Sequence, residues 1–294
     1  MILHTVINVL PKGLTKMVLE LKNINKIYGS NCNKCLDSTG AKFNSSICPH
    51  CGSIVAVNNI NLKLKKGEVL GIVGESGSGK STLLQLIYQD QKATNGILHI
   101  DNFVDEAGRC KNALEANENE LRYLRNELMS MIYQNPMLGL NYQFSAGGNI
   151  AEKIIMSGER NYQKIREKAL YFLDKTEIPT SRIDDYPNFF SGGQQQRIQI
   201  SKALSSNPKI LLLDEPTTGL DLSVQAKILD LIKALQKSIG FSMIIVSHDL
   251  GVIKHLTDIC IVMKNGEIVE YGLSDQILQD PQHPYTQLLV SSVL

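Results

Sequence analysis

The residues with the clearest chemical potential form a glycine-rich run in the first third of the chain. Residues 74–81 read GESGSGKS, which matches the pattern G-x-x-x-x-G-K-[ST]. Glycines let backbone N–H groups curl round phosphates, and a helix N-terminus adds its positive dipole end. An apolar run precedes the motif and an amphipathic helical pattern follows it, as a phosphate loop requires. We therefore predict a nucleotide site in which Lys80 reaches the β- and γ-phosphates and Ser81 binds Mg²⁺.

Two carboxylates follow a second apolar run, Ile210–Leu213. Asp214 is positioned to hold the Mg²⁺ shell, as the second acid of a P-loop NTPase does. Glu215 is then available to orient and polarise the attacking water. A pair of solvated acids at the end of a strand would have the same pattern, so this interpretation depends on the neighbouring motifs.

A second potential anion site lies at residues 191–194, which read SGGQ and open a helical pattern. A serine at the cap followed by two glycines leaves the first N–H groups of the helix available to an anion. One chain needs only one phosphate-binding loop for one nucleotide. A second anion site therefore indicates that each nucleotide is bound between two copies of the chain.

Four cysteines form a third candidate site. Cys32, Cys35, Cys48 and Cys51 follow the spacing C-x2-C-x12-C-x2-C. Two such pairs can supply four thiolates to a tetrahedral Zn²⁺. The spacing favours a structural zinc centre, while an iron–sulfur centre and free or redox-active thiols remain alternatives. Cys260 lies within an apolar run and is expected to be inert core.

The elements that must position these residues follow from the apolar pattern. Short, continuously apolar runs predict strands buried on both faces, as in a parallel sheet flanked by helices. They are Val69–Val73, Met129–Tyr133, Ile210–Leu213 and Met243–Val246. Alternating runs at Val18–Ile27, Val57–Leu64 and Gly96–Ile100 predict a second, half-buried set. Asn265-Gly266 predicts a hairpin turn between Ile259–Lys264 and Glu267–Tyr271.

Taken together, these motifs resemble the ATP-binding cassette family. The resemblance implies an α/β fold of the P-loop NTPase type with a mostly parallel core, an antiparallel β subdomain and an inserted helical subdomain. It covers residues 17–294, with the helical subdomain at 135–190, a zinc-ribbon-like insertion with four cysteines at 29–53 and an N-terminal extension at 1–16. The motifs that carry it are Tyr28, residues 74–81, Gln134, residues 191–194, Asp214-Glu215, Gly219-Leu220-Asp221 and His248. Phe190 departs from the leucine usual in that family.

The resemblance also implies ATP hydrolysis and a role for each motif residue. It implies catalytic roles for Lys80, Gln134, Glu215 and His248, and Mg²⁺ contacts for Ser81, Gln134 and Asp214. Two copies would close head to tail over two ATP molecules, so a homodimer is expected. Nucleotide contacts are implied for Tyr28, Gly74, Ser76, Gly77, Ser78, Gly79, Lys80, Ser81, Thr82, Gln134, Ser191, Gly192, Gly193, Gln194, Asp214 and Asp221.

Two branches of this family share features with the chain. Residues 194–197, 221–226 and 283–289 resemble the ATPases of oligopeptide- and nickel-type importers, which need separate membrane permease subunits. Residues 145–150 (SAGGNI), 178–179, 182–185 and 288–294 resemble the ATP-binding subunits of phosphonate carbon–phosphorus lyase systems. We favour the lyase branch, which implies docking on soluble lyase core subunits rather than cleavage of the C–P bond itself. The expected docking surface is 137–150, where Gly139, Gly147 and Gly148 would allow close backbone approach.

The composition excludes several other classes of protein. The 294 residues carry 30 Lys plus Arg against 29 Asp plus Glu, and this balance argues against non-specific nucleic-acid binding. No apolar run approaches the ~20 residues that span a bilayer, and the first ten residues lack the pattern of a signal peptide. We expect a cytoplasmic protein.

Overall fold

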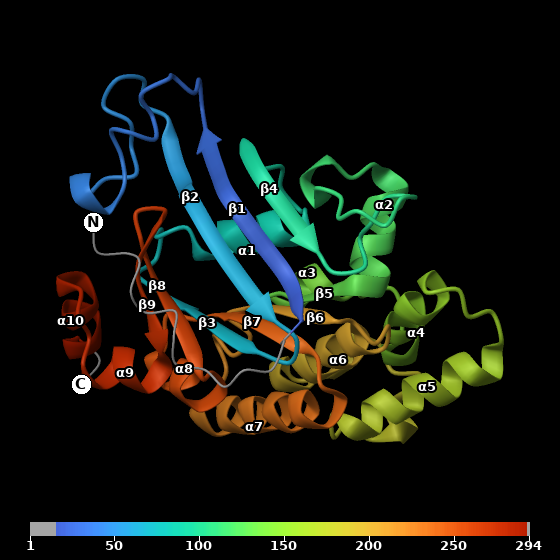
Figure 1. Cartoon of the computed structure of the whole chain (residues 1–294). Coiled ribbons are helices and arrows are strands. Elements are labelled where there is room, and N and C mark those ends of the chain that lie inside the picture. The colour runs from blue at the N-terminus through green and yellow to red at the C-terminus, as the bar shows by residue number, and fades with distance from the viewer. Residues whose placement is uncertain (1–15, 293–294) are drawn as a thin grey trace.

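The computed structural model describes residues 16–292, so the expected N-terminal extension at 1–16 lies almost wholly outside the described residues. Two sheets, a layer of helices and a lateral helical subdomain make up the fold (Figure 1). Within residues 16–292, no helix is long and apolar enough to cross a membrane.

The central sheet has six strands in the order β5-β6-β7-β3-β8-β9, and only β9 runs antiparallel to its neighbour. Every residue of β3, β5, β6 and β7 is buried, as the continuously apolar runs predicted. The functional motifs at 74–81, 214–215 and 247–248 follow three of these parallel strands and therefore meet at one edge. The strands are β3 (Val69–Val73), β5 (Met129–Ile132), β6 (Ile210–Asp214), β7 (Ser242–Val246), β8 (Ile259–Lys264) and β9 (Glu267–Leu273).

A smaller antiparallel sheet lies across the central one (Figure 1), in the order β2-β1-β4. Its strands are β1 (Met17–Tyr28), β2 (Ile54–Lys65) and β4 (Asn95–Ile100). Alternating burial in β2 matches the alternation of its sequence. Helix α1 (Lys80–Tyr88) buries Leu83, Leu84 and Ile87 in the core between the two sheets.

The opposite face of the central sheet is covered by helices. Helix α7 ends at Gly240, whose φ of 81° is the left-handed conformation predicted for a helix-ending glycine. These helices form the second core with the sheet. They are α6 (Gly192–Leu204), α7 (Leu222–Ile239), α8 (Leu250–Leu256), α9 (Ser274–Gln279) and α10 (Pro284–Ser291).

Residues 135–190 form a helical region at the side of the sheet domain (Figure 1), and it has a core of its own. That core includes Phe190 and is completed by Ile198 of α6. The helices are α3 (Pro136–Gly139), α4 (Ala146–Met156), α5 (Tyr162–Lys175), η4 (Thr180–Arg182) and η5 (Pro187–Phe189). Between β4 and β5 lie η2 (Ala113–Glu115), α2 (Glu118–Tyr123) and η3 (Leu124–Leu128).

Two glycines expected at a docking surface instead make close contacts inside the protein. Gly147 is buried, and a Cβ placed there would lie 2.5 Å from Cγ1 of Ile183. A Cβ at Gly139 would lie 2.4 Å from Oε1 of Gln199. For Gly147 the expectation of close approach by a partner's backbone was wrong, because Ile183 of the same chain already occupies that space. Gly139 and Gly148 are half-buried, and Gly139 lines a cavity, so for these two a docking role stays a prediction.

The cysteine segment connects β1 to β2 as a projecting loop that contains η1 (Ala41–Phe43). It lies above the tip of the β8–β9 hairpin (Figure 1). At that tip, Asn265 and Gly266 have φ values of 48° and 83°, the left-handed pair that an Asn-Gly hairpin turn uses.

Candidate nucleotide site and cysteine cluster

The phosphate loop is held against other backbone segments so tightly that two of its glycines cannot be replaced without movement. A Cβ at Gly74 would lie 2.3 Å from the carbonyl oxygen of Met263, and one at Gly79 would lie 2.1 Å from that of Ala56. Both residues also have positive φ values, 150° and 103°. The loop shape therefore depends on β2 and β8 as well as on its own sequence.

Lys80 lies in the loop with its ammonium group buried among oxygen atoms. Its Nζ donates hydrogen bonds of 2.8 Å to the carbonyl oxygens of both Gly74 and Glu75. Burial lowers the pKa of Lys80, while the carboxylates of Glu215, Asp214 and Glu75 oppose that shift. A buried cation at the N-terminus of a helix, beside a glycine-rich loop, suits a phosphate ligand.

The Ser78 hydroxyl lies in the same loop and is buried without a hydrogen-bond partner among residues 16–292. Buried hydroxyls nearly always have a partner, so an orphan at this position fits a bound phosphate oxygen. On that observation the loop fits the phosphates of a nucleotide.

Ser81 and Asp214 form an oxygen pair at the start of α1. The Ser81 Oγ donates a hydrogen bond of 2.8 Å to Oδ1 of Asp214. Burial raises the pKa of Asp214, and the bond from Ser81 partly offsets that rise. Hydroxyl and carboxylate oxygens are ligands that Mg²⁺ prefers, so this pair fits that ion.

Glu215 is the meeting point of three polar side chains. Its Oε1 lies 3.0 Å from Nδ1 of His248, and its Oε2 accepts hydrogen bonds from Gln134 at 3.3 Å and Thr218 at 3.0 Å. Its φ of 45° is unusual for a residue with a side chain, and such strain gathers at functional sites. Sequence reasoning named Gln134 and His248 beside Glu215 but missed Thr218.

The start of helix α6 is exposed and closed only by its own residues. Ser191 accepts a hydrogen bond from the Gln194 N–H, and the Gln194 side chain accepts one from the Ser191 N–H, which is a capping box. Ser191 and Gly192 are exposed, whereas Gly193 is buried against Val224. The described hydrogen bonds of these residues do not join them to the phosphate loop.

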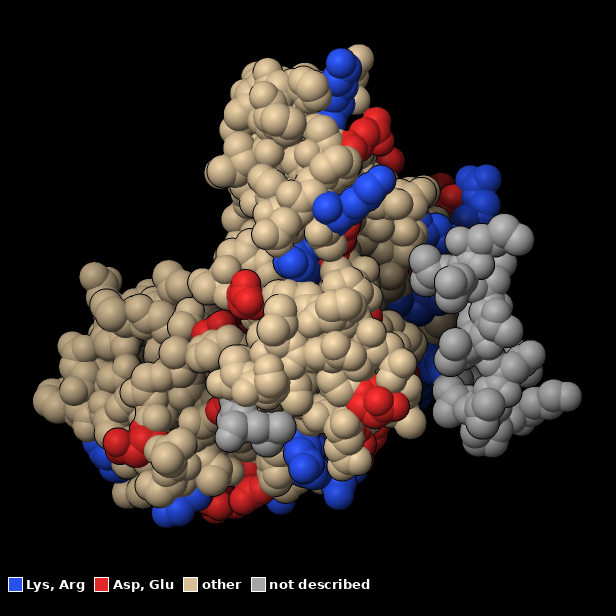
Figure 2. Space-filling view, turned by 90° about the vertical axis from the view of Figure 1, so that its left-hand side faces the viewer, with Lys and Arg blue, Asp and Glu red and all other residues tan. Residues whose placement is uncertain are grey.

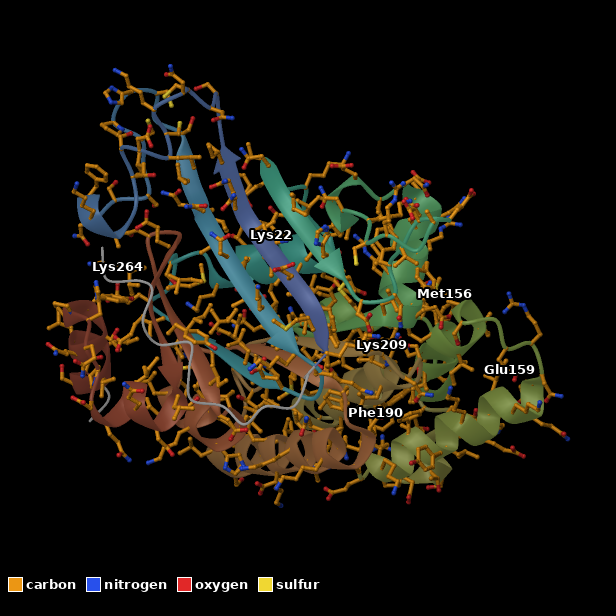
Figure 3. The ribbon with its side chains drawn as sticks, viewed as in Figure 1. Lys22, Met156, Glu159, Phe190, Lys209 and Lys264 are labelled. Atoms are coloured by element: carbon orange, nitrogen blue, oxygen red, sulfur yellow. The ribbon has the colours of Figure 1, made fainter. Side chains whose placement is uncertain are left out.

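Two further residues flank the start of α6. Phe190, next to α6 in Figure 3, is buried beneath the Arg182 guanidinium, which lies 4.0 Å from its ring centroid. Its role is therefore apolar packing, and this suits the exchange for leucine noted in the sequence. Asp221 caps α7 and is exposed, with no hydrogen bond from its side chain to the helix.

Tyr28 ends β1 with its ring partly exposed. Its hydroxyl bonds to Gln91, and Nζ of Lys26 lies 4.7 Å from the ring centroid. A flat, accessible ring at this position can stack on a planar base.

A residue from the far end of the chain also supports the phosphate loop. The Tyr285 hydroxyl, at the start of α10, accepts a hydrogen bond of 3.0 Å from the Glu75 N–H. Lys264 of β8, labelled in Figure 3, places its Nζ 4.9 Å from the Tyr285 ring centroid. Sequence reasoning did not connect Tyr285 with the nucleotide site, since no spacing rule links residues 75 and 285.

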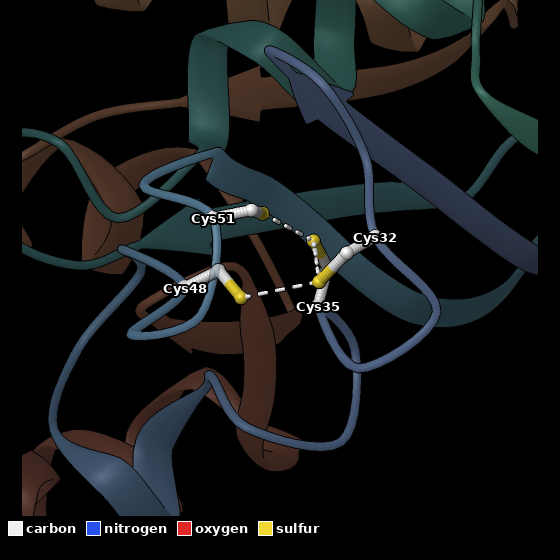
Figure 4. A group of neighbouring side chains, drawn as sticks. All are labelled: Cys32, Cys35, Cys48 and Cys51. Carbon is white, nitrogen blue, oxygen red and sulfur yellow. Dashed lines mark hydrogen bonds between the residues drawn. The ribbon is translucent and has the colours of Figure 1, made fainter.

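The four cysteines converge in the projecting insertion (Figure 4). Their sulfur atoms all lie within 4.8 Å of one another, with separations of 3.6 Å for Cys32–Cys35, 3.7 Å for Cys32–Cys48 and 3.4 Å for Cys35–Cys51. A thiolate set of this kind fits Zn²⁺ and does not fit hard ions such as Mg²⁺. His50 is exposed and lies outside the group of four sulfur atoms. Cys260 is buried in β8, and burial raises the pKa of its thiol to about 12, in keeping with inert core.

The environment of the cluster divides the thiols into two kinds. Burial raises the pKa of Cys35 to about 12. Hydrogen bonding with Ser53 lowers the pKa of Cys51 to about 5.

Charge is evenly mixed on the exposed face shown in Figure 2. Lysines, arginines and acids are scattered over this face, and no broad patch of one sign is visible on it. This pattern is in keeping with the balanced composition.

A cavity of about 880 Å³ lies away from the phosphate loop, between the sheet domain and the helical region. Its walls include Tyr133, just before Gln134, and the basic side chains of Arg125, Lys153 and Lys202. Next to it, Met137 and Leu138 are 65% and 70% exposed. A polar groove edged by exposed apolar side chains is suited to receiving another protein.

Comparison with known proteins agrees with this geometry. Residues 57–218 match the ABC transporter family. Over 237 residues, the chain is 47% identical to the putative phosphonates utilization ATP-binding protein PhnK of Escherichia coli strain K12, spanning 81% of this chain and 91% of that protein. It is 40% identical over 245 residues to the glutathione import ATP-binding protein GsiA of the same organism, spanning 82% of this chain but 39% of that longer protein.

Solved structures are similar as well. The dimeric ATP-binding cassette MJ0796, bound to ADP and Pi, has a TM-score of 0.71 and 31% identity, covering 87% of this chain and 98% of that one. The structure of cbiO1 from Clostridium perfringens has a TM-score of 0.71 and 25% identity, covering 90% and 92%. The fold predicted from the sequence is confirmed, and the chain belongs to the ATP-binding cassette family of ATPases.

Proposed function

We propose that the chain binds MgATP at the phosphate loop and hydrolyses it with Glu215 as the residue that polarises water. The loop amides, Lys80 and the Ser78 hydroxyl would hold the phosphates. Ser81 and Asp214, with Gln134, would hold Mg²⁺, which neutralises phosphate charge when bound. Ser76, Gly77 and Thr82 complete the loop, and Tyr28 would stack on the adenine.

The contacts of Glu215 support its assignment. His248 and Thr218 contact the two carboxylate oxygens and hold the group in one orientation. Glu215 can therefore polarise a water by accepting its proton. Gln134 bonds to the same carboxylate and also begins the segment that leads to the cavity. A change at the γ-phosphate can therefore pass to the partner surface through Gln134.

The second half of each site would come from a second copy. At the start of α6, the N–H groups of Gly192 and Gly193 have no partner among the described hydrogen bonds. Together with Ser191 and Gln194, they would bind a γ-phosphate that another chain holds. Asp221 would bridge the two copies near the sites. A head-to-tail homodimer with two ATP molecules between its subunits is the assembly we propose.

The ATPase would serve phosphonate breakdown by docking on soluble subunits of a carbon–phosphorus lyase core. The observation that carries this proposal is the 47% identity to PhnK over 91% of that protein. The docking surface we propose is the cavity beside Gln134 together with the exposed Met137 and Leu138. ATP-driven closure would move this surface and so remodel the core.

A co-purification experiment tests the docking proposal. The tagged chain, isolated from cells using a phosphonate as sole phosphorus source, should bring soluble lyase subunits with it. Leu138→Asp should lose them while keeping ATPase activity, because a charge would replace an exposed apolar contact. Leu288→Asp is the matched control, since Leu288 is also 70% exposed but lies on α10.

An importer ATPase is the alternative function. The 40% identity to GsiA and the importer-like residues at 283–289 favour it. In that case the same purification would yield membrane permease subunits, and the wild-type gene would restore peptide uptake rather than growth on a phosphonate.

We further propose that the cysteine cluster holds one structural Zn²⁺. Four converging sulfur atoms support this assignment. With all four positions filled by thiolates, no position is open for a substrate, so the centre would be structural rather than catalytic.

A further inference from the structure

The cysteine insertion looks separate from the nucleotide site in the sequence, but it is joined to it in the structure. Residues 29–53 follow Tyr28 and end at β2, the strand whose Ala56 carbonyl lies against Gly79 of the phosphate loop. The insertion connects β1, which ends at the proposed adenine contact Tyr28, to β2, which supports the phosphate loop. A change in the order of the insertion would therefore act on both contacts. Two chains of contacts carry that effect.

The first chain is polar and passes through Glu267. This carboxylate accepts a hydrogen bond of 2.9 Å from the Ala41 N–H of the insertion and one of 3.0 Å from Nδ2 of Asn58. A Cβ at Gly40 would lie 2.1 Å from Oε1 of Glu267, so the insertion backbone closes tightly over this carboxylate. Glu267 therefore ties the insertion to the β8–β9 hairpin.

Asn58 continues the chain to the phosphate loop. Its side chain also donates 3.1 Å to the Leu36 carbonyl, and its backbone N–H donates 2.8 Å to the Gly266 carbonyl. The Gly266 N–H in turn donates 3.0 Å to the carbonyl oxygen of Ser78. The hairpin tip thus holds the residue whose buried hydroxyl fits a phosphate.

The second chain is apolar and passes along β2. Val55 is completely buried in the small cluster formed with Cys35 and Cys48. The next residue, Ala56, supplies the carbonyl that abuts Gly79, and the Val55 carbonyl would lie 3.0 Å from a Cβ at Gly266. Packing of Val55 on the cysteines therefore fixes β2, the strand that contacts the phosphate loop.

The apolar core of the insertion is small. The fully buried residues of its apolar cluster are Cys35, Cys48 and Val55. A core this small does not stabilise a loop of this length, whereas metal binding to four thiolates does. We infer that the insertion is ordered when metal is bound and loosened without it, and both sets of contacts begin in it.

We propose that Glu267 and Asn58 are positioning residues that make nucleotide affinity depend on the metal content of the cysteine cluster. Metal orders the insertion, Glu267 and Asn58 transmit that order to Gly266, and Gly266 holds Ser78 in the phosphate-binding shape. This inference rests on the proposed metal centre but not on the proposed partner. By linkage, nucleotide must raise metal affinity by the same factor that metal raises nucleotide affinity.

The test measures the Kd for MgADP by calorimetry, because ADP reports on the phosphate loop without hydrolysis. Metal content is measured first. Wild-type protein is then compared as purified, after a zinc-selective chelator and dialysis, and after reloading with Zn²⁺. We expect metal removal to raise the Kd about tenfold, within the usual range of coupling between sites, and reloading to reverse it.

Two variants separate transmission from general damage. Glu267→Ala should raise the Kd of the metal-loaded protein and reduce the effect of metal removal to less than about threefold, because one chain of contacts is already cut. Glu267→Gln, which keeps the size of the side chain but loses one acceptor, should lie between it and wild type. Asp37→Ala, at an exposed carboxylate of the same insertion, is the matched control and should behave as wild type.

Each outcome has a distinct meaning. Protein without bound metal overturns the metal centre and this coupling together. Bound metal whose removal leaves the MgADP affinity unchanged overturns the coupling alone, as does a metal effect of full size in Glu267→Ala. A Zn²⁺ affinity, measured at equilibrium by competition with the chelator, that saturating MgADP leaves unchanged also contradicts the coupling, since linkage is reciprocal.

Discussion

Two helices of this protein begin with glycine-rich sequences suited to phosphate, yet their surroundings differ. The start of α1 is enclosed: Lys80 is 5% exposed, Ser81 bonds to Asp214, and Gly79 abuts Ala56. The start of α6 is open, with Ser191 and Gly192 exposed and bonded only within their own helix.

The difference shows what one chain can and cannot do alone. At α1 the chain brings together the Lys80 cation, the Ser81–Asp214 oxygen pair and the Glu215 carboxylate. At α6 it presents an exposed helix start whose described capping hydrogen bonds stay within the helix. Because phosphoryl transfer needs negative charge neutralised from several sides, we propose that the enclosed site is one half of the catalyst and that the open helix of a second copy is the other half.

The largest effect is expected within the enclosed half. Glu215→Gln should keep MgATP binding but lower turnover about 10²- to 10⁴-fold, because a neutral amide cannot accept a proton from the attacking water. Steady-state ATPase assays measure the turnover, and nucleotide titration measures the affinity for MgATP. Near-normal turnover would remove Glu215 from the mechanism.

A substitution at the exposed start of α6 should lower ATP turnover without changing the affinity of a single chain for MgADP. Ser191→Arg should lower turnover about 100-fold, because the bulky cation covers the free N–H groups. Binding of MgADP to one chain should be unchanged. Ser181→Arg, at an exposed serine of the neighbouring helical region, is the control and should retain activity. A loss of MgADP affinity in Ser191→Arg would mean that the two halves are not separate.

A smaller effect should come from the support behind the enclosed half. Tyr285→Phe removes the hydroxyl that accepts from the Glu75 N–H, so the KM for ATP should rise about threefold, as expected for one hydrogen bond, with kcat nearly unchanged. Tyr271→Phe, at an exposed tyrosine of β9, is the control. Equal behaviour of the two variants would show that Tyr285 does not position the loop.

Much of this fold could be predicted because its signals are local. The apolar runs that become β3 and β6 continue on both faces of a strand, which is the pattern of a covered parallel sheet. The turn at Asn265-Gly266 and the helix end at Gly240 depend on left-handed backbone that few residues adopt. The cysteine spacing likewise predicted the convergence of four sulfur atoms.

The contacts that could not be predicted join distant segments. Nothing near Glu267 in the sequence indicates that it receives Ala41, which lies 226 positions away. Gly147 reads as a surface glycine because its neighbours are polar and small, and only the packing of Ile183 shows that it is interior. Such contacts follow from how the sheets and helices stack, and no residue pattern records that.

The most direct test of the two-half account is the mass of Glu215→Gln in solution, measured by sedimentation with and without MgATP. The account predicts a monomer without nucleotide, a dimer with MgATP, and a monomer again when Ser191→Arg is added to the same chain. A species that stays monomeric with MgATP, or a dimer that persists in the double variant, would contradict it.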